Sequence, residues 1–121
     1  MSKRLLSIDD DPGILSLIRG VAREMELDVD VVTHGSYFMA ADVRKKPDAI
    51  TLDIIMPDMD GIELLRWLGD VGCTAHVILL SGASFQYAKM AKRLGEDGGR
   101  LNVSCLYKPF SIHDLRTTLA A

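Results

Sequence analysis

Short apolar runs alternate along the chain with longer segments in which apolar residues recur every three or four positions. The short runs are rich in Val, Ile and Leu, which is typical of strands, whereas the longer repeats are typical of helices with one buried face. Strands are predicted at residues 5–8, 29–32, 49–52, 76–80 and 103–107. Helices are predicted at residues 12–25, 36–43, 62–68, 85–94 and 111–119.

This regular alternation of strand and helix predicts an α/β fold. A strand that follows a helix in this way lies parallel to the strand before it, and the helices cover both faces of the sheet. The continuous apolar run at residues 77–80 fits a strand buried on both faces. The 121 residues leave room for one core, so we expect a single domain over residues 1–121 with a five-stranded parallel sheet in three α/β/α layers.

Charge and hydropathy exclude two classes of partner. The chain has fourteen Lys and Arg residues and seventeen Asp and Glu residues, which gives a net charge of −3 and argues against electrostatic binding of nucleic acid. No apolar run approaches the roughly 20 residues of a membrane span. Cys73 and Cys105 lack the spacing of metal ligands. We therefore expect a cytoplasmic domain with free thiols.

Polar residues with complementary chemistry follow four of the predicted strands: Asp9-Asp10-Asp11, Asp53, Ser81-Gly82 and Lys108-Pro109. Ligands of such sheets bind beyond the carboxyl ends of the strands. Clustered carboxylates repel one another, and Mg²⁺ offsets that repulsion while it retains affinity for phosphate oxygens. A lysine and a hydroxyl would hold further phosphoryl oxygens, which leaves one carboxylate to act as nucleophile and become an acyl phosphate.

Each of these residues taken alone has a simpler interpretation. Consecutive aspartates often only stabilise a helix N-terminus, and an Asp or Lys-Pro after a strand is usually part of a turn. All four together, each at a strand end, favour one shared site.

Four segments in this order resemble the receiver domain of two-component response regulators: Ser-Ile-Asp-Asp-Asp-Pro at 7–12, Leu-Asp-Ile-Ile-Met-Pro-Asp-Met-Asp-Gly at 52–61, Leu-Ser-Gly at 80–82 and Tyr-Lys-Pro-Phe at 107–110. The resemblance covers essentially the whole chain. It implies the flavodoxin-like or CheY-like strand order 2-1-3-4-5.

The resemblance also implies roles for individual residues. Asp53 would accept a phosphoryl group from a sensor histidine kinase or a phosphotransfer protein, and would lose it slowly without separate enzymatic turnover. Ser81 and Lys108 would bind the phosphoryl oxygens. The ligands of Mg²⁺ would be the carboxylates of Asp9, Asp10 and Asp53 and the backbone carbonyl of Ile55.

Three features depart from the usual receiver pattern. Receivers usually carry an aromatic residue three positions before the lysine, where this chain has Cys105, while Tyr107 directly precedes Lys108. This substitution predicts an altered coupling to Ser81. The stretch between Ser81 and Lys108 is longer than usual, which predicts an extended fourth helix and loop around residues 95–100. Ile55 and Ala83 flank the expected path of the hydrolytic water and cannot orient it, which predicts slow autodephosphorylation.

Several alternatives remain open at this stage. The run Ser81-Gly82-Ala83, followed by Leu101-Asn102-Val103, Leu106 and Lys108-Pro109-Phe110, resembles receivers fused to EAL-type cyclic-di-GMP phosphodiesterases. One alternative is therefore that the chain is the N-terminal receiver of a larger regulator. A degenerate receiver that serves only as an interaction module is a second alternative. A third is an aspartyl phosphatase that uses Asp9 and Asp11, which turnover of a phosphomonoester would reveal. The downstream effector is open, and a homodimer through the fourth helix, fifth strand and fifth helix is a further possibility.

Overall fold

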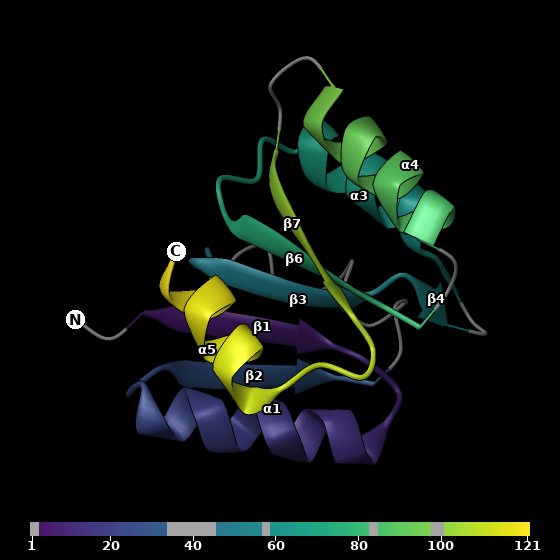
Figure 1. Ribbon diagram of the computed structural model, residues 1–121. Helices are drawn as coiled ribbons and strands as arrows, with labels where there is room; N and C mark the ends of the chain where they lie inside the picture. The colour runs from purple at the N-terminus through teal and green to yellow at the C-terminus, as the bar shows by residue number, and fades with distance from the viewer. Residues whose placement is uncertain (1–2, 34–45, 57–58, 83–84, 98–100) are drawn as a thin grey trace.

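A five-stranded parallel sheet forms the centre of the computed structural model (Figure 1), which describes residues 3–33, 46–56, 59–82, 85–97 and 101–121. Its strands are β1 (Arg4–Ile8), β2 (Asp28–Val32), β3 (Ala49–Asp53), β6 (His76–Ser81) and β7 (Asn102–Tyr107). They lie in the order β2-β1-β3-β6-β7. Counted along the chain, these five strands have the predicted order 2-1-3-4-5, so the predicted topology is confirmed.

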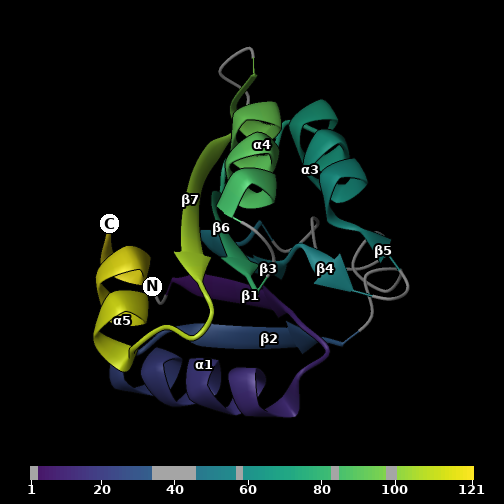
Figure 2. The ribbon, with the colours of Figure 1, turned by 45° about the vertical axis from the view of Figure 1, so that its right-hand side comes forward.

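Helices cover both faces of the sheet (Figure 2). On one face lie α1 (Pro12–Glu24) and α5 (Ile112–Ala120), and on the other lie α3 (Gly61–Asp70) and α4 (Phe85–Glu96). Each helix pair packs its own apolar cluster against the sheet. The predicted helix at residues 36–43 falls outside the described residues. None of the described helices has the length and apolar character needed to cross a membrane.

The helix starts follow from local side-chain chemistry. Asp11 precedes α1, and its Oδ1 accepts hydrogen bonds from the backbone N–H of Gly13 at 2.8 Å and of Ile14 at 3.4 Å. Ser111 caps α5 in the same manner, by accepting from the N–H of Asp114 at 3.0 Å. Such caps satisfy N–H groups that have no partner within the helix, and Ser111 is the residue at which the last helix was predicted to begin.

The segment after β3 was not predicted. Strands β4 (Ile55–Met56) and β5 (Met59–Asp60) form a separate antiparallel pair. Gly61 then lies so close to Ile54 that a Cβ on Gly61 would be 2.8 Å from both the Cα and the carbonyl oxygen of Ile54. Only glycine fits at this approach, which folds the chain back next to the end of β3.

Candidate functional site

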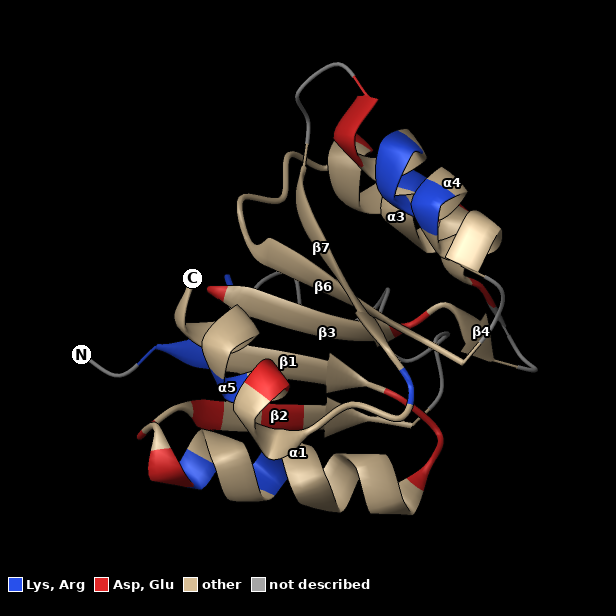
Figure 3. Ribbon diagram, viewed as in Figure 1, with Lys and Arg blue, Asp and Glu red and all other residues tan. Residues whose placement is uncertain are grey.

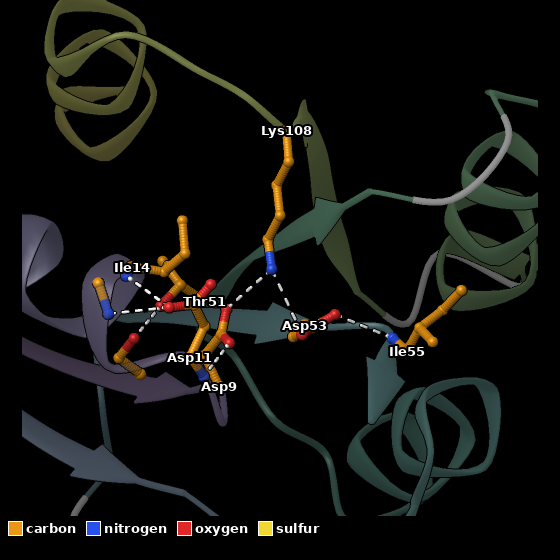
Figure 4. Close-up of polar contacts among 9 residues, drawn as sticks. Asp9, Asp11, Ile14, Thr51, Asp53, Ile55 and Lys108 are labelled. Carbon is orange, nitrogen blue, oxygen red and sulfur yellow. Dashed lines mark hydrogen bonds and ion pairs between the residues drawn. The ribbon is translucent and has the colours of Figure 1, made fainter. Parts of the chain in front are cut away.

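Asp9, Asp53 and Lys108 lie together at the carboxyl edge of the sheet (Figure 4). Asp9 follows β1, Asp53 is the last residue of β3, and Lys108 follows β7. The Nζ of Lys108 lies 3.2 Å from Oδ2 of Asp9 and 3.4 Å from Oδ2 of Asp53. The predicted convergence of strand ends therefore brings these three residues into direct contact.

Backbone amides hold the other oxygen of each buried carboxylate. Oδ1 of Asp9 accepts from the N–H of Asp11 at 2.9 Å, and Oδ1 of Asp53 accepts from the N–H of Ile55 at 3.0 Å. Asp9 is fully buried and Asp53 is 7% exposed. Both carboxylates are thus fixed in orientation, and they share the single ammonium group of Lys108.

The surroundings shift the pKa values of Asp53 and Lys108. Burial is the largest effect on Asp53 and raises its pKa, an effect that the Ile55 amide and Lys108 oppose and that the charge of Asp9 reinforces. Burial lowers the pKa of Lys108, but Asp53 and Asp9 together raise it more, so that its pKa is above the usual value. Lys108 therefore stays protonated next to Asp53, a carboxylate whose ionisation is made costly by burial.

Three carboxylates form a set that fits a divalent cation. Asp9, Asp10 and Asp53 each offer an oxygen, and these oxygens lie within 4.8 Å of one another. Asp10 is exposed, whereas the other two are buried. Carboxylate oxygens that keep one side open to solvent suit Mg²⁺, which retains several of its waters. The donor set therefore fits the ion that the sequence predicted.

Ser81 and Ile55 complete the surroundings of Asp53. Ser81 ends β6 and is 1% exposed, and its carbonyl accepts the N–H of Lys108 at 2.7 Å. Ile55 directs its amide to Asp53 but leaves its side chain 57% exposed. Charged residues collect at this edge of the sheet, where acidic residues follow β1, an acidic residue ends β3 and a basic residue follows β7 (Figure 3).

A comparison with protein families identifies the family to which the chain belongs. The family model described as "Response regulator receiver domain" matches residues 5–120. The chain belongs to this family. Receiver domains are signalling domains of two-component systems, and they bind Mg²⁺ at an acidic pocket and interact with histidine kinases or phosphotransfer proteins.

Individual relatives support the same assignment. The response regulator MprA of Mycobacterium leprae is 28% identical over 118 residues, which are 98% of this chain and 50% of that protein. The alkaline phosphatase synthesis transcriptional regulatory protein PhoP of Bacillus subtilis is 26% identical over 122 residues, 100% of this chain and 48% of that protein. The receiver domain described here thus spans about half the length of these curated relatives.

Solved structures extend the likeness to the fold. A response regulator from Colwellia psychrerythraea is 31% identical with a TM-score of 0.83, covering 99% of this chain and 95% of that one. The receiver domain of the Francisella response regulator 1452 is 29% identical with a TM-score of 0.83, covering 98% of this chain and 94% of that one.

This receiver domain has a distinctive arrangement next to Lys108. Cys105 is half-buried, and its thiol donates toward the carbonyl of Ala88 in α4 at 3.8 Å. Burial raises the pKa of this thiol. The ring of Tyr107 lies 5.3 Å from the ring of Phe85 at the start of α4. The aromatic contact to α4 therefore comes from the exposed end of β7.

Ala83 and residues 98–100, on which two predictions rest, fall outside the described residues.

Proposed function

We propose that this receiver domain is a phosphoacceptor switch in which Asp53 becomes an aspartyl phosphate. The observation that carries the proposal is the position of Lys108, whose Nζ touches Oδ2 of both Asp9 and Asp53. Because this ammonium group already contacts both carboxylates, it is positioned to pair with the phosphoryl oxygens once one of the carboxylates acquires a phosphoryl group.

The proposed chemistry is a transfer of a phosphoryl group from a phosphohistidine. A carboxylate oxygen of Asp53 forms a bond to phosphorus, while the bond from phosphorus to the imidazole nitrogen of the donor breaks and its electron pair stays on that nitrogen. Such transfers depend on positioning and charge neutralisation more than on covalent help from neighbouring groups. The Ile55 amide fixes Oδ1 of Asp53 at 3.0 Å, which leaves the other oxygen as the nucleophile.

The remaining residues have distinct proposed tasks. Asp9, Asp10, Asp53 and the backbone carbonyl of Ile55 would hold Mg²⁺, which when bound neutralises charge on the phosphoryl oxygens. Lys108 moves from its pairing with Asp53 to a phosphoryl oxygen. The hydroxyl of Ser81 donates to another phosphoryl oxygen, and the accompanying movement of β6 shifts the population of α4 positions that a partner reads.

The proposed partners follow from this function. The donor is a sensor histidine kinase or a phosphotransfer protein, and the setting is the cytoplasm. The partner that recognises the phosphorylated state is a downstream effector. This effector is either a separate protein or a further domain of a longer chain, for which an EAL-type phosphodiesterase is one alternative. A homodimer through α4, β7 and α5 is a further alternative. An interaction-only receiver is disfavoured because Asp10, Asp53, Ser81 and Lys108 are all present.

Incubation with acetyl phosphate and Mg²⁺, followed by intact-mass spectrometry, tests the proposal. We expect the protein to gain one phosphoryl group. The gain should disappear in Asp53→Asn and in a sample treated with chelator. An equal gain in Asp53→Asn would overturn the role of Asp53. No gain from either acetyl phosphate or a panel of phosphorylated histidine phosphotransfer domains would favour the interaction-only receiver.

A further inference from the structure

A pair of buried hydroxyls joins β1 and β3 directly below the acidic site. The Oγ of Ser7 and the Oγ1 of Thr51 lie 2.6 Å apart, and both residues are fully buried. They are register partners in neighbouring parallel strands, although 44 residues separate them in the chain.

The pair shares a sheet face with the two buried carboxylates. Side chains in a strand alternate between faces, and Ser7 and Thr51 each lie two positions before an aspartate, Asp9 and Asp53. The two hydroxyls thus lie on the same face as the two carboxylates, one side-chain position earlier along each strand. Around these hydroxyls the face is lined by Leu5, Ile78 and Leu80, which pack against α1 and α5.

The buried polar residues in the described part of the chain are Ser7, Asp9, Thr51, Asp53 and Ser81. Four of these five belong to the row of hydroxyls and carboxylates carried by β1 and β3. Three of these five lie at the proposed phosphoryl site, and the other two are the hydroxyl pair. Packing does not require that pair, because two apolar side chains of the same shape fill such a space with little or no loss of stability.

The two strands carry like charges at their ends. Asp9 and Asp53 repel each other, and the charge of Asp9 contributes to the unfavourable surroundings of Asp53. Their oxygens must nevertheless stay within the 4.8 Å that lets them share one cation with Asp10. A hydrogen bond between side chains one layer below opposes separation of these strand ends, on the same face as the carboxylates.

We propose that Ser7 and Thr51 are positioning residues for the acidic site, and that their hydrogen bond holds Asp9 and Asp53 at the separation that binds Mg²⁺. This inference rests on the proposed function, because it concerns the cation that phosphoryl transfer requires. Neither hydroxyl is among the proposed ligands of the cation or of the phosphoryl group. Both act through the strands that carry the ligands.

The test measures the dissociation constant of Mg²⁺ by calorimetry, without phosphoryl donor, for Ser7→Ala, Thr51→Val and the double variant. Each single substitution should weaken Mg²⁺ binding by about three- to tenfold, the range that corresponds to one net hydrogen bond. The double variant should bind about as weakly as either single variant, because both substitutions remove the same interaction.

Two further variants separate positioning from stability. Thr51→Ser keeps the hydroxyl and should retain wild-type affinity for Mg²⁺. Ile78→Val removes one methylene from the buried register neighbour of Thr51 on β6 and should lower stability toward urea without a change in Mg²⁺ affinity. If Thr51→Val and Ser7→Ala bind Mg²⁺ as tightly as wild type, the inference is wrong. If they weaken binding no more than Ile78→Val does, it is equally wrong.

The same titrations distinguish this failure from failure of the proposed function. A wild-type protein that binds Mg²⁺ and gains a phosphoryl group, with variants that bind equally well, refutes only the positioning role. A wild-type protein that binds no Mg²⁺ refutes both.

Discussion

The Nζ of Lys108 lies 3.4 Å from Oδ2 of Asp53, although 55 residues separate the two in the chain. The same Nζ lies 3.2 Å from Asp9, so that one ammonium group neutralises part of a cluster that would otherwise hold only negative charge. A divalent cation in this cluster must therefore compete with Lys108. That competition gives the lysine two opposite effects, one on metal binding and one on phosphoryl transfer.

Replacement Lys108→Met should separate these two effects. Without the ammonium group, Mg²⁺ should bind about tenfold more tightly or better, because a positive charge next to its ligands has been removed. Phosphorylation by acetyl phosphate at saturating Mg²⁺ should nevertheless slow by at least about tenfold, because a donor to the phosphoryl oxygens is lost. Calorimetry and timed mass spectrometry measure the two quantities. Weaker Mg²⁺ binding in the variant would contradict the competition.

Stability without metal should fall in the same variant. Loss of one partner of a buried ion pair costs about 3–5 kcal/mol, and we expect about 2–3 kcal/mol here because the Lys108 side chain is 21% exposed. Urea unfolding in chelator measures the loss, and addition of Mg²⁺ should restore more stability in Lys108→Met than in wild type. If Mg²⁺ restored the same amount of stability in Lys108→Met and in wild type, the carboxylates would not be left without a compensating charge in the variant, and the prediction would be wrong.

The raised pKa of Asp53 predicts a pH-dependent cost of folding. In the metal-free protein at any pH above the raised folded pKa, Asp53 is ionised in both states, and the folded state bears the full cost of burying the charge. As pH falls through the raised folded pKa toward the ordinary value of 3.8, the folded state takes up the proton first and the cost disappears. Asp53→Asn should therefore be more stable than wild type at neutral pH, by a margin that vanishes below the ordinary pKa. A margin that is independent of pH would contradict this sign.

Much of the fold could be predicted from the pattern of the sequence. The apolar runs at β3 and β6, the proline at position 12 and the cap Ser111 are local signals, and they gave the element order and the starts of the first and last helices. The β4–β5 pair could not be predicted, because it has only two residues per strand and depends on the contact of Gly61 with Ile54. The 12-residue α4 ends at Glu96, two residues beyond its predicted end, because its apolar pattern stops before its hydrogen bonding does.

The candidate site was predictable to a similar extent. Residues at strand ends could be grouped because parallel strands bring their carboxyl ends to one edge. The hydroxyl pair was missed, although Ser7 and Thr51 are polar residues within otherwise apolar runs, and that interruption was the available signal. The tilted contact between the rings of Tyr107 and Phe85 was also missed, since a contact between a strand end and a helix start depends on tertiary packing.

Gly61 provides a direct test of the close approach after β3. A Cβ at this position would lie 2.8 Å from backbone atoms of Ile54, which cannot rotate away. Gly61→Ala should therefore destabilise the protein by about 1–3 kcal/mol. Gly20→Ala in α1 is the matched control, because its Cβ would meet nothing within 4 Å, and it should stabilise by about 0.5–1 kcal/mol. Urea unfolding compares the two, and similar effects in both would refute the proposed clash.

Ile55 is expected to prolong the lifetime of the aspartyl phosphate. Its side chain is 57% exposed beside Asp53, and it offers no group that could orient an attacking water. Ile55→Asn should speed hydrolysis several-fold, with Ile55→Val as the apolar control that leaves the rate unchanged. The decay of the phosphorylated mass after removal of donor measures the rate, and equal rates in the Asn variant and wild type would sink this explanation.

The most direct test of the central claim is to locate the phosphoryl group on the chain. Phosphorylated protein is treated with borohydride, which reduces an aspartyl phosphate to homoserine, and the position of homoserine is read by tandem mass spectrometry after digestion. The proposed function predicts homoserine at position 53, in an amount that depends on Mg²⁺. Homoserine at position 9, 10 or 11 instead would show that another carboxylate is the acceptor, and would contradict it.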